Sequence, residues 1–308
     1  MGESKQKLMV SVWVITYNHV NYIGKCLESI LSQKTSFSFE ICLGEDDSSD
    51  GTRELCRRYA GMHPDKIRLF ERERNDPRRK GCAGVWQYNY IETLRACHGK
   101  YIALCDGDDF WSSTDKLQKQ VDLLEKYPDL SGCFHKVGQV DEDDNVICAD
   151  MGYPPIRQQR YSLDYLLRYG VFSPVLSVVF RNREDIAPDW FRQSLVGDIL
   201  LHTGNLLEGD YGFLDEVMGY YRIHSQGLAS GSSRRELVKI SIQAFKLMGE
   251  HYSIAERKSY RQGLRTLYLS YIIESVLCWC LPKKFKHKFD LGAGRGFRSL
   301  ARRLISGL

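Results

Sequence analysis

Two apolar runs without alternating polar residues mark this chain of 308 residues. Leu8–Ile15 and Tyr101–Cys105 have the pattern of strands that are buried on both faces of a parallel sheet. Shorter strands are predicted at Phe39–Leu43 and Ile67–Phe70, and the segments between the strands carry apolar residues at helical spacing. This alternation predicts an open, doubly wound α/β sheet with a ligand cleft at the carboxyl ends of the strands.

The remaining segments are more varied. A helix is predicted before the strand at Tyr101, with Gly99 as its C-cap, and the charged segment ERERNDPRRKGCAG is expected to be a surface loop. SPVLSVVFRN is predicted to add a strand to the sheet. Two further helices are predicted at Leu237–Tyr252 and Ser259–Cys280, and the apolar run in the second is too short to span a bilayer comfortably.

Three carboxylates follow the strand at Tyr101–Cys105. Asp106, Asp108 and Asp109 are so close together that they raise one another's pKa and destabilise the fold unless a cation neutralises them. The motif contains no Lys or Arg, whereas Mn2+ and Mg2+ prefer carboxylate oxygens and also bind water and phosphates. The pattern therefore favours a divalent-cation site, and the alternative is a solvated acidic turn without a ligand.

Two other polar turns follow buried strands in the same way. Thr16 and Tyr17 come after the first strand, and Glu45–Asp47 come after the second. Because the carboxyl ends of parallel strands lie at one edge of a sheet, these turns and the acidic motif are expected to line one crevice. Charges without a function would be scattered over both edges, so this coincidence favours a binding site.

Composition indicates a folded globular protein and gives no indication of nucleic-acid binding. The chain is 43% hydrophobic, and its formal net charge is only +4. The charge is uneven, because residues 281–308 contain eight Lys or Arg and one Asp. The motifs KKFKHK and RSLARRLISGL predict a basic amphipathic tail on an anionic cytoplasmic membrane surface, with packing on the domain as the alternative.

Cysteine usage and the N-terminus indicate a location. The 10 cysteines show no CxxC spacing and no pairing rhythm, which is typical of small buried side chains in a reducing compartment. The segment MGESKQKLMV has no apolar core of signal-peptide length. We therefore expect a cytoplasmic protein, peripheral on the inner face of the plasma membrane if the tail binds there.

Four motifs, in order, carry a resemblance to a known family. They are VSVWVITYNHVNYIGKCLESILSQ, EICLGEDDSSDGT, GKYIALCDGDDFW followed by DKLQKQVDLLEKYP, and YYRIHSQGLAS. Together they resemble glycosyltransferase family 2, the inverting, nucleotide-sugar-dependent enzymes of GT-A fold. The resemblance covers about Met9 to Ser230.

The resemblance implies a fold and a division of the chain. The expected fold is an α/β, GT-A type (Rossmann-like), mostly parallel sheet sandwiched by helices, with a C-terminal helical extension. Residues 1–232 would form the glycosyltransferase domain, with a nucleotide-binding half at 8–130 and an acceptor half at 131–232. Residues 233–308 would form the helical extension with its basic amphipathic tail.

The resemblance also implies where the nucleotide binds. Its expected contacts are Thr16, Tyr17, Asn18, Glu45, Asp46, Asp106 and Gly107. Tyr17 would stack on the base, and Asp46 would accept the imide N–H of uracil or thymine. A buried ring is the alternative for Tyr17, and a helix-dipole partner is the alternative for Asp46. The family commonly has Asp-Asp-Gly-Ser here, whereas this chain has Glu45, Asp46, Asp47 and Ser48, so the carboxylate that touches the base is left open.

The residues around Asp108 match the family's DxD motif. Asp108 would hold a Mn2+ or Mg2+ ion that bridges the donor's two phosphates, and His224 in YYRIHS would add a metal or pyrophosphate contact. Asp109 and Arg222 are further implied donor contacts. A structural role is the alternative for His224, and pairing with a nearby carboxylate is the alternative for Arg222.

An inverting transfer needs a base opposite the leaving group to take the acceptor hydroxyl's proton. The resemblance points to Asp198 in VGDILLH as this base, although Gly197 stands where an acidic residue is commoner. The alternative is that Asp198 caps the helix that follows it.

Two functions from different classes follow from these patterns. The first is a metal-dependent glycosyltransferase that moves a sugar from a UDP- or dTDP-linked donor to a hydroxyl of a glycan or lipid-linked acceptor in cell-surface polysaccharide synthesis. The second is a non-catalytic nucleotide-sugar-binding scaffold at the membrane. Intact Asp106, Asp108 and Asp198 favour the enzyme, because a scaffold needs no base. A nucleotidyltransferase would need a Lys-rich loop, which the turn TYNHVN does not supply.

Overall fold

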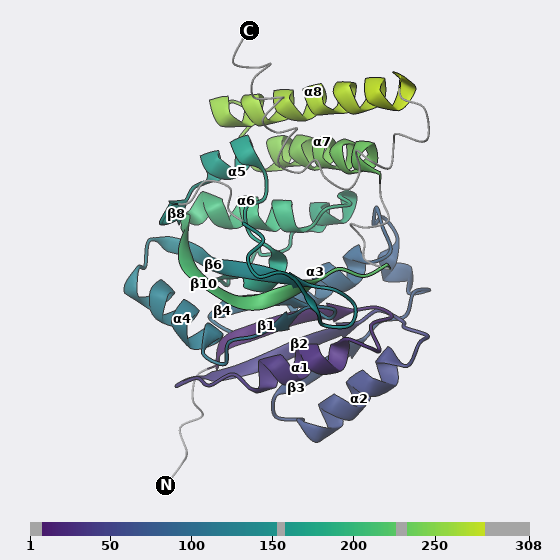
Figure 1. Ribbon diagram of the computed structural model, residues 1–308, viewed down its shortest axis with the longest axis vertical. Coiled ribbons are helices and arrows are strands. Elements are labelled where there is room, and N and C mark those ends of the chain that lie inside the picture. The colour runs from purple at the N-terminus through teal and green to yellow at the C-terminus, as the bar shows by residue number, and fades with distance from the viewer. Residues whose placement is uncertain (1–7, 153–157, 226–232, 281–308) are drawn as a thin grey trace. The chain divides into compact units, whose positions relative to one another are not determined.

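A mixed sheet of ten strands forms the centre of the larger of two units (Figure 1). The structure is a computed structural model that describes residues 8–152, 158–225 and 233–280. Eight strands follow one another in the order β3-β2-β1-β4-β9-β6-β10-β5, while β7 pairs with β6 and β8 with β10. The bounds are β1 Leu8–Thr16, β2 Ser38–Glu45, β3 Ile67–Glu71, β4 Tyr101–Asp106, β5 Phe110–Trp111, β6 Leu130–Val140, β7 Val146–Cys148, β8 Arg160–Tyr161, β9 Val179–Arg181 and β10 Asp210–Arg222.

The first half of the sheet is parallel, and its strands end level with one another. β1 lies between β2 and β4, with Thr16 opposite Glu45 and Ile15 opposite Asp106. The turns that follow these three strands therefore begin at one edge of the sheet. This register is the structural basis of the site described below.

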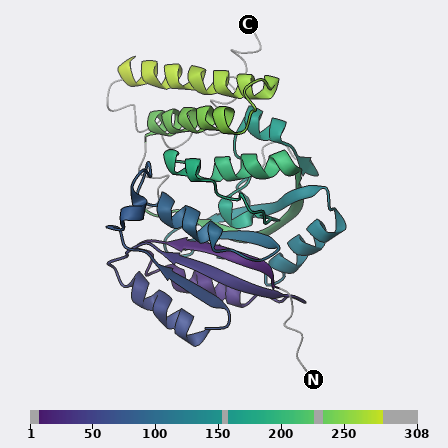
Figure 2. The same ribbon diagram turned by 180° about the vertical axis from the view of Figure 1, so that it is seen from behind.

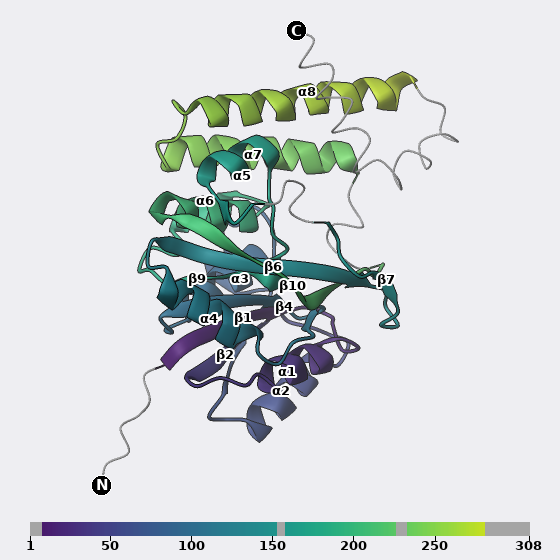
Figure 3. The ribbon, with the colours of Figure 1, turned by 60° about the vertical axis from the view of Figure 1, so that its left-hand side comes forward.

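The second half of the sheet brings the end of β10 to the same edge. β9 is antiparallel to both β4 and β6, and the long strands β6 and β10 run parallel and side by side (Figure 3). The short strand β5 pairs with β10, with Tyr220 opposite Phe110. Because β5 directly follows the acidic turn, this pairing brings Arg222 and His224 next to Asp108 and Asp109.

Helices cover both faces of this sheet (Figures 1 and 2). On one face, Val10, Val12 and Val14 of β1 share an apolar core with α1, α2 and α4. On the other face, Trp13 packs edge-on against Tyr90 of α3, with its indole N–H donating to the Tyr90 carbonyl at 3.2 Å. The helices of this unit are α1 Ile23–Leu31, α2 Thr52–Met62, α3 Gln87–Arg95, α4 Lys116–Lys126, α5 Leu163–Tyr169 and α6 Asp198–Glu208, with 3-10 turns η1 Pro77–Arg79, η2 Val175–Ser177 and η3 Asp189–Gln193.

The predicted α/β fold class is confirmed, and the four predicted parallel strands lie within one or two residues of their expected bounds. Gly99 is a correction, because α3 ends at Arg95 and its C-cap is Ala96. Gly99 instead lies against the backbone of β1, where an added Cβ would be only 2.4 Å from the nitrogen of Ser11. Close packing against β1 therefore requires glycine at this position.

The second unit, Gln226–Leu308, contains two helices in its described part. They are α7 Arg234–His251, which begins with a capping box of Ser233 and Glu236, and α8 Lys258–Cys280. The two pack together through Phe245 and Tyr260, whose hydroxyl donates to the Phe245 carbonyl at 3.0 Å. Among the described residues, no helix combines the length and apolar character needed to cross a membrane. The expected basic tail at 281–308 lies outside the described residues, and the boundary expected at residue 232 stays a prediction.

We predict that Gly99→Ala lowers the free energy of unfolding by about 1–3 kcal/mol, because the new methyl group must displace the backbone of β1. The matched control is Gly61→Ala, since a Cβ at Gly61 in α2 meets nothing within 4 Å. Alanine is the better helix former, so this control should be neutral or stabilising by up to about 1 kcal/mol. Urea denaturation of both variants measures the difference, and equal stabilities would contradict the prediction.

Candidate active site

Three turns at the carboxyl edge of the sheet are bonded into one assembly. The turn after β1 binds the turn after β2, because the Asn18 N–H donates to Ser48 Oγ at 2.9 Å and the His19 N–H donates to Thr52 Oγ1 at 2.8 Å. The acidic turn after β4 joins them through the Gly107 N–H, which donates to the Ile15 carbonyl at 2.9 Å. A Cβ on Gly107 would lie 2.8 Å from the Thr16 side chain, so glycine permits this approach.

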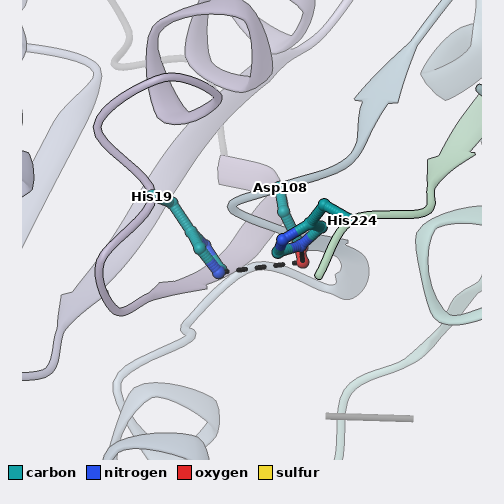
Figure 4. Close-up of side chains that lie close together, drawn as sticks. All are labelled: His19, Asp108 and His224. Atoms are coloured by element: carbon teal, nitrogen blue, oxygen red, sulfur yellow. Dashed lines mark hydrogen bonds and ion pairs between the residues drawn. The ribbon is translucent and has the colours of Figure 1, made fainter. Parts of the chain in front are cut away.

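Asp108 lies between two imidazoles (Figure 4). Its Oδ2 is 3.0 Å from Nε2 of His224, which follows β10, and 3.7 Å from Nε2 of His19, which lies in the turn after β1. One ligand atom from each of the three residues lies within 4.8 Å of the others. Burial opposes ionisation of Asp108, but the His224 hydrogen bond and the two imidazole charges together hold its pKa below the usual value.

This cluster fits a divalent cation. A carboxylate oxygen and imidazole nitrogens are ligands for Mn2+ and related ions, and both imidazoles face the Asp108 carboxylate. Buried polar atoms without a hydrogen-bond partner among the described residues also gather here, namely Thr16 Oγ1, His19 Nδ1 and Asp109 Oδ2. Such atoms are costly in a fold that binds nothing, so they support a polar ligand at this edge.

Asp106 and Asp198 are two further carboxyl groups with raised pKa values. Burial, together with the charges of Asp108 and Asp198, raises the pKa of Asp106 to about 8. Burial also raises the pKa of Asp198, although its Oδ1 accepts the Ile199 N–H at 2.7 Å. The alternative that Asp198 caps α6 is wrong, because the N-cap is Gly197 and Asp198 is the first helical residue.

Close packing against Tyr90 explains why residue 197 is a glycine. A Cβ at this position would lie 2.8 Å from the ring of Tyr90, which packs edge-on against Trp13. The acidic side chain that is commoner at this position in the family therefore has no room unless Tyr90 moves. Asp198 consequently enters the site without a neighbouring acid before it.

Arg222 and Asp109 hold the acidic turn in place. The Arg222 guanidinium donates to the carbonyls of Asp108 and Asp141 at 2.9 and 3.0 Å and to the Asp144 carboxylate at 2.7 Å. The Arg222 N–H donates to Asp109 Oδ1 at 2.9 Å, while burial and the charge of Asp108 raise the pKa of Asp109 well above its usual range. Pairing of Arg222 with a carboxylate is thus observed, and contact of either residue with the donor stays a prediction.

The residues expected around the base lie at the end of β2. Glu45 is fully buried, and its carboxylate accepts the Ser48 N–H at 2.7 Å and the Arg53 side chain at 2.5 Å. Asp46 is also buried and pairs with Arg79 at 2.6 Å and with Arg74 at 3.3 Å. Burial is the largest influence on the Asp46 pKa and raises it, although both arginines oppose the shift.

Tyr17 is the exposed member of this group. Its side chain is 39% exposed, so the alternative of a buried ring is wrong. The guanidinium of Arg74 lies 3.6 Å from the centre of the Tyr17 ring. Asn18 adopts a left-handed conformation with φ of 53°, and its Oδ1 accepts the Ser49 N–H at 3.0 Å. Base contacts by these residues stay predictions.

Sequence reasoning missed three residues of this site. His19 was visible only as one polar residue in a turn, and no ligand spacing links it to Asp108. Arg74 and Arg79 belong to the charged segment that was expected to be a surface loop, yet Arg79 is 8% exposed and both pair with Asp46. The signal that could have identified the two arginines was Asp46, because a carboxylate buried at the end of a strand needs cationic or hydrogen-bonding partners.

The chain belongs to glycosyltransferase family 2. The sequence model described as "Glycosyl transferase family 2" matches residues 11–182, which is more than half of the chain. The chain's match to the first curated relatives spans 60% of their length, and solved structures of similar shape share the GT-A fold.

An uncharacterized protein of Mycobacterium tuberculosis is 34% identical over 220 residues, which cover 71% of this chain and 60% of that relative. S. aureus TarS in complex with UDP-GlcNAc is similar in fold, with a TM-score of 0.62 at 15% identity over 91% of this chain and 78% of that one. The mannosyltransferase PcManGT of Pyrobaculum calidifontis, in complex with GDP-Man and Mn2+, has a TM-score of 0.51 at 16% identity over 98% of this chain and 84% of that one.

We predict that Arg222→Lys lowers the free energy of unfolding by about 1.5–3 kcal/mol, because a lysine cannot bridge the acidic turn and Asp144 at once. The control is Arg57→Lys, whose side chain is 54% exposed and pairs with Glu71. The same change there should have little effect on stability, because an exposed ion pair contributes little. Guanidinium denaturation followed by tryptophan fluorescence compares the two, and a loss as small as the control's would contradict the role given to Arg222.

Proposed function

We propose that this protein transfers a sugar, with inversion, from a UDP- or dTDP-linked donor to a hydroxyl of a glycan or lipid-linked acceptor in cell-surface polysaccharide synthesis. The observation that carries the proposal is the position of Asp108 between two imidazoles, at the edge that also holds Asp106 and Asp198. Complexes of fold neighbours with UDP-GlcNAc and with GDP-Man and Mn2+ support a nucleotide-sugar donor and a cation. Family membership favours the enzyme over the non-catalytic scaffold.

Asp108 and His224 would hold the cation beside the donor's two phosphates. When bound, a divalent cation supplies charge that stabilises the leaving diphosphate more than the intact donor. Asp109 and Arg222 would contact the donor, and their bonds also support the step by fixing the turn that presents the Asp108 carboxylate. Asp106, whose pKa burial and the neighbouring carboxylates raise to about 8, would lie beside the donor's nucleotide.

Asp198 would accept the proton of the attacking hydroxyl. Burial raises the pKa of Asp198, which makes its carboxylate a stronger base than an exposed aspartate. A base is most effective when its pKa approaches the working pH. The first residue of α6 therefore has the chemistry required on the face opposite the leaving group.

The base would lie near Tyr17 and Asp46. An exposed ring can stack on a base, and a carboxylate can accept the imide N–H of uracil or thymine. Arg74 now lies over Tyr17 and pairs with Asp46, and its side chain is 33% exposed. Base binding would therefore require Arg74 to turn away, whereas Arg79 keeps one Asp46 oxygen paired.

The acceptor and the location rest on sequence alone. The eight basic residues of 281–308 support an anionic membrane surface and hence a lipid-linked acceptor. This placement would put the protein on the cytoplasmic face of the membrane.

The test is calorimetric titration of the full chain with UDP, dTDP and GDP, in Mn2+ and in chelator. We predict that UDP or dTDP binds only with the cation and that Asp108→Asn weakens this binding at least about tenfold, because the variant removes the central cation ligand. Asp65→Asn is the control, since Asp65 is exposed and precedes β3, at the opposite end of the strand from the site. Binding that ignores both the cation and Asp108 would refute the proposed site, and a preference for GDP would refute the proposed base.

We predict that Asp198→Asn lowers kcat for donor turnover by about 10²–10⁴-fold and leaves donor affinity within about twofold, because the base contributes to proton transfer and not to nucleotide binding. Hydrolysis of the nucleotide sugar that the binding panel selects measures this, with water as acceptor. In the wild type, activity falls as Asp198 takes up a proton, so its raised pKa moves the acidic limb of kcat/KM above the ordinary value of 3.8. A variant with unchanged kcat, or one that loses donor binding, would rule out Asp198 as the base.

A further inference from the structure

His19 is fixed by its backbone so that its ring faces the cation cluster. The His19 N–H donates to Thr52 Oγ1 at 2.8 Å, and the next N–H, of Val20, donates to Asp50 Oδ2 at 3.1 Å. The preceding residue, Asn18, turns the chain with a φ of 53°. These bonds belong to the fold of the two turns, and they aim the imidazole at Asp108 (Figure 4).

Within the described part of the chain, the His19 ring makes no hydrogen bond that explains its position. Its Nδ1 is buried without a partner among the described residues. Its Nε2 lies 3.7 Å from Asp108 Oδ2, which is too long for a hydrogen bond. A half-buried polar ring whose nitrogens gain no bond from folding is better explained by a ligand than by the fold.

The distances from Asp108 to the two imidazoles are close to those between neighbouring ligands of one ion. Nitrogen and oxygen ligands lie about 2.0–2.2 Å from a small divalent cation, so two neighbouring ligands of that ion are about 3.0–3.6 Å apart. The observed separation from Asp108 Oδ2 is 3.0 Å to His224, which lies in this range, and 3.7 Å to His19, which lies just above it, so a small shift of the His19 ring would bring it into place. The His19 and His224 rings are nearly perpendicular, at 88°, with their centres 5.9 Å apart. Such rings can direct both nitrogens to one point from different sides.

We propose that His19 is a third protein ligand of the cation, together with Asp108 and His224, and that this ligand set selects Mn2+ over Mg2+. The inference deepens the proposed function and rests on its cation site. Imidazole suits transition-metal ions, whereas Mg2+ prefers oxygen ligands and keeps most of its water. Three protein ligands also allow the cation to bind before the nucleotide, with its remaining positions left for diphosphate oxygens and water.

The experiment is Mn2+ titration of the full, nucleotide-free chain, followed by the loss of the free Mn2+ EPR signal. We expect one Mn2+ per chain, Mg2+ binding at least about tenfold weaker, and a loss of at least about tenfold in Mn2+ affinity for His19→Asn. His98→Asn is the matched control, because His98 is exposed and precedes the amino end of β4. It should bind Mn2+ as the wild type does. Circular dichroism checks the fold of each variant, and His19→Gln provides a second variant.

Pulsed EPR of the bound Mn2+ separates a ligand from a structural residue. Nitrogen couplings from two imidazoles are expected in the wild type, and couplings from one are expected in His19→Asn at saturating Mn2+. A structural role for His19 would weaken binding without removing one set of nitrogen couplings. The signal therefore reports on the bond itself, independently of any transferase activity.

The remaining outcomes distinguish a failure of the third ligand from a failure of the proposed cation site. If His19→Asn keeps wild-type affinity and couplings while Asp108→Asn and His224→Asn lose the ion, the third ligand is refuted and the proposed cation site stands. If none of the three variants affects Mn2+ binding, the cation site of the proposed function fails as well. Equal affinities of the wild type for Mg2+ and Mn2+ would refute the selectivity.

Discussion

The crowding of three carboxyl groups at the end of β4 is the constraint on which the rest of the site depends. Two unit charges 4 Å apart repel by about 4 kcal/mol at an effective dielectric of about 20, which is a large part of a domain's stability. Burial raises the pKa of Asp106 and of Asp109, whereas the His224 hydrogen bond and the two imidazoles overcome the effect of burial on Asp108 and hold its pKa below the usual value. Asp108 is thus the carboxyl group of this turn that ionises most readily, which suits it to bind a cation.

The same constraint explains the rigidity of the surrounding turns. A carboxylate can select one ion only if its position is fixed, and Arg222 fixes it by bonding the turn to β10 and to Asp144. Gly107 and Gly197 then matter for the space they leave, since a Cβ on either would meet Thr16 or the ring of Tyr90. The site is therefore held by backbone contacts between elements that the sheet register has already aligned.

The sequence was sufficient for the parts of the structure that local patterns encode. Unbroken apolar runs predicted the four parallel strands, and the order of the elements predicted the edge at which Asp106, Asp108 and Thr16 meet. It was insufficient where a residue's role comes from a distant partner. His19 meets Asp108 only because β1 and β4 are neighbours, and the arginines of the charged segment pair with Asp46 across a tertiary contact. Gly99 was misassigned for the same reason, because its constraint is the backbone of β1.

The measurement that tests this account most directly is anomalous diffraction at the manganese edge from crystals grown with Mn2+ and UDP. The account predicts one strong peak within about 2.3 Å of Asp108 and of the nearest nitrogens of His19 and His224, with the diphosphate on its open side. A peak at another place, or UDP bound at this edge without any manganese, would contradict the claim that this carboxylate and its imidazoles form the cation site of the enzyme.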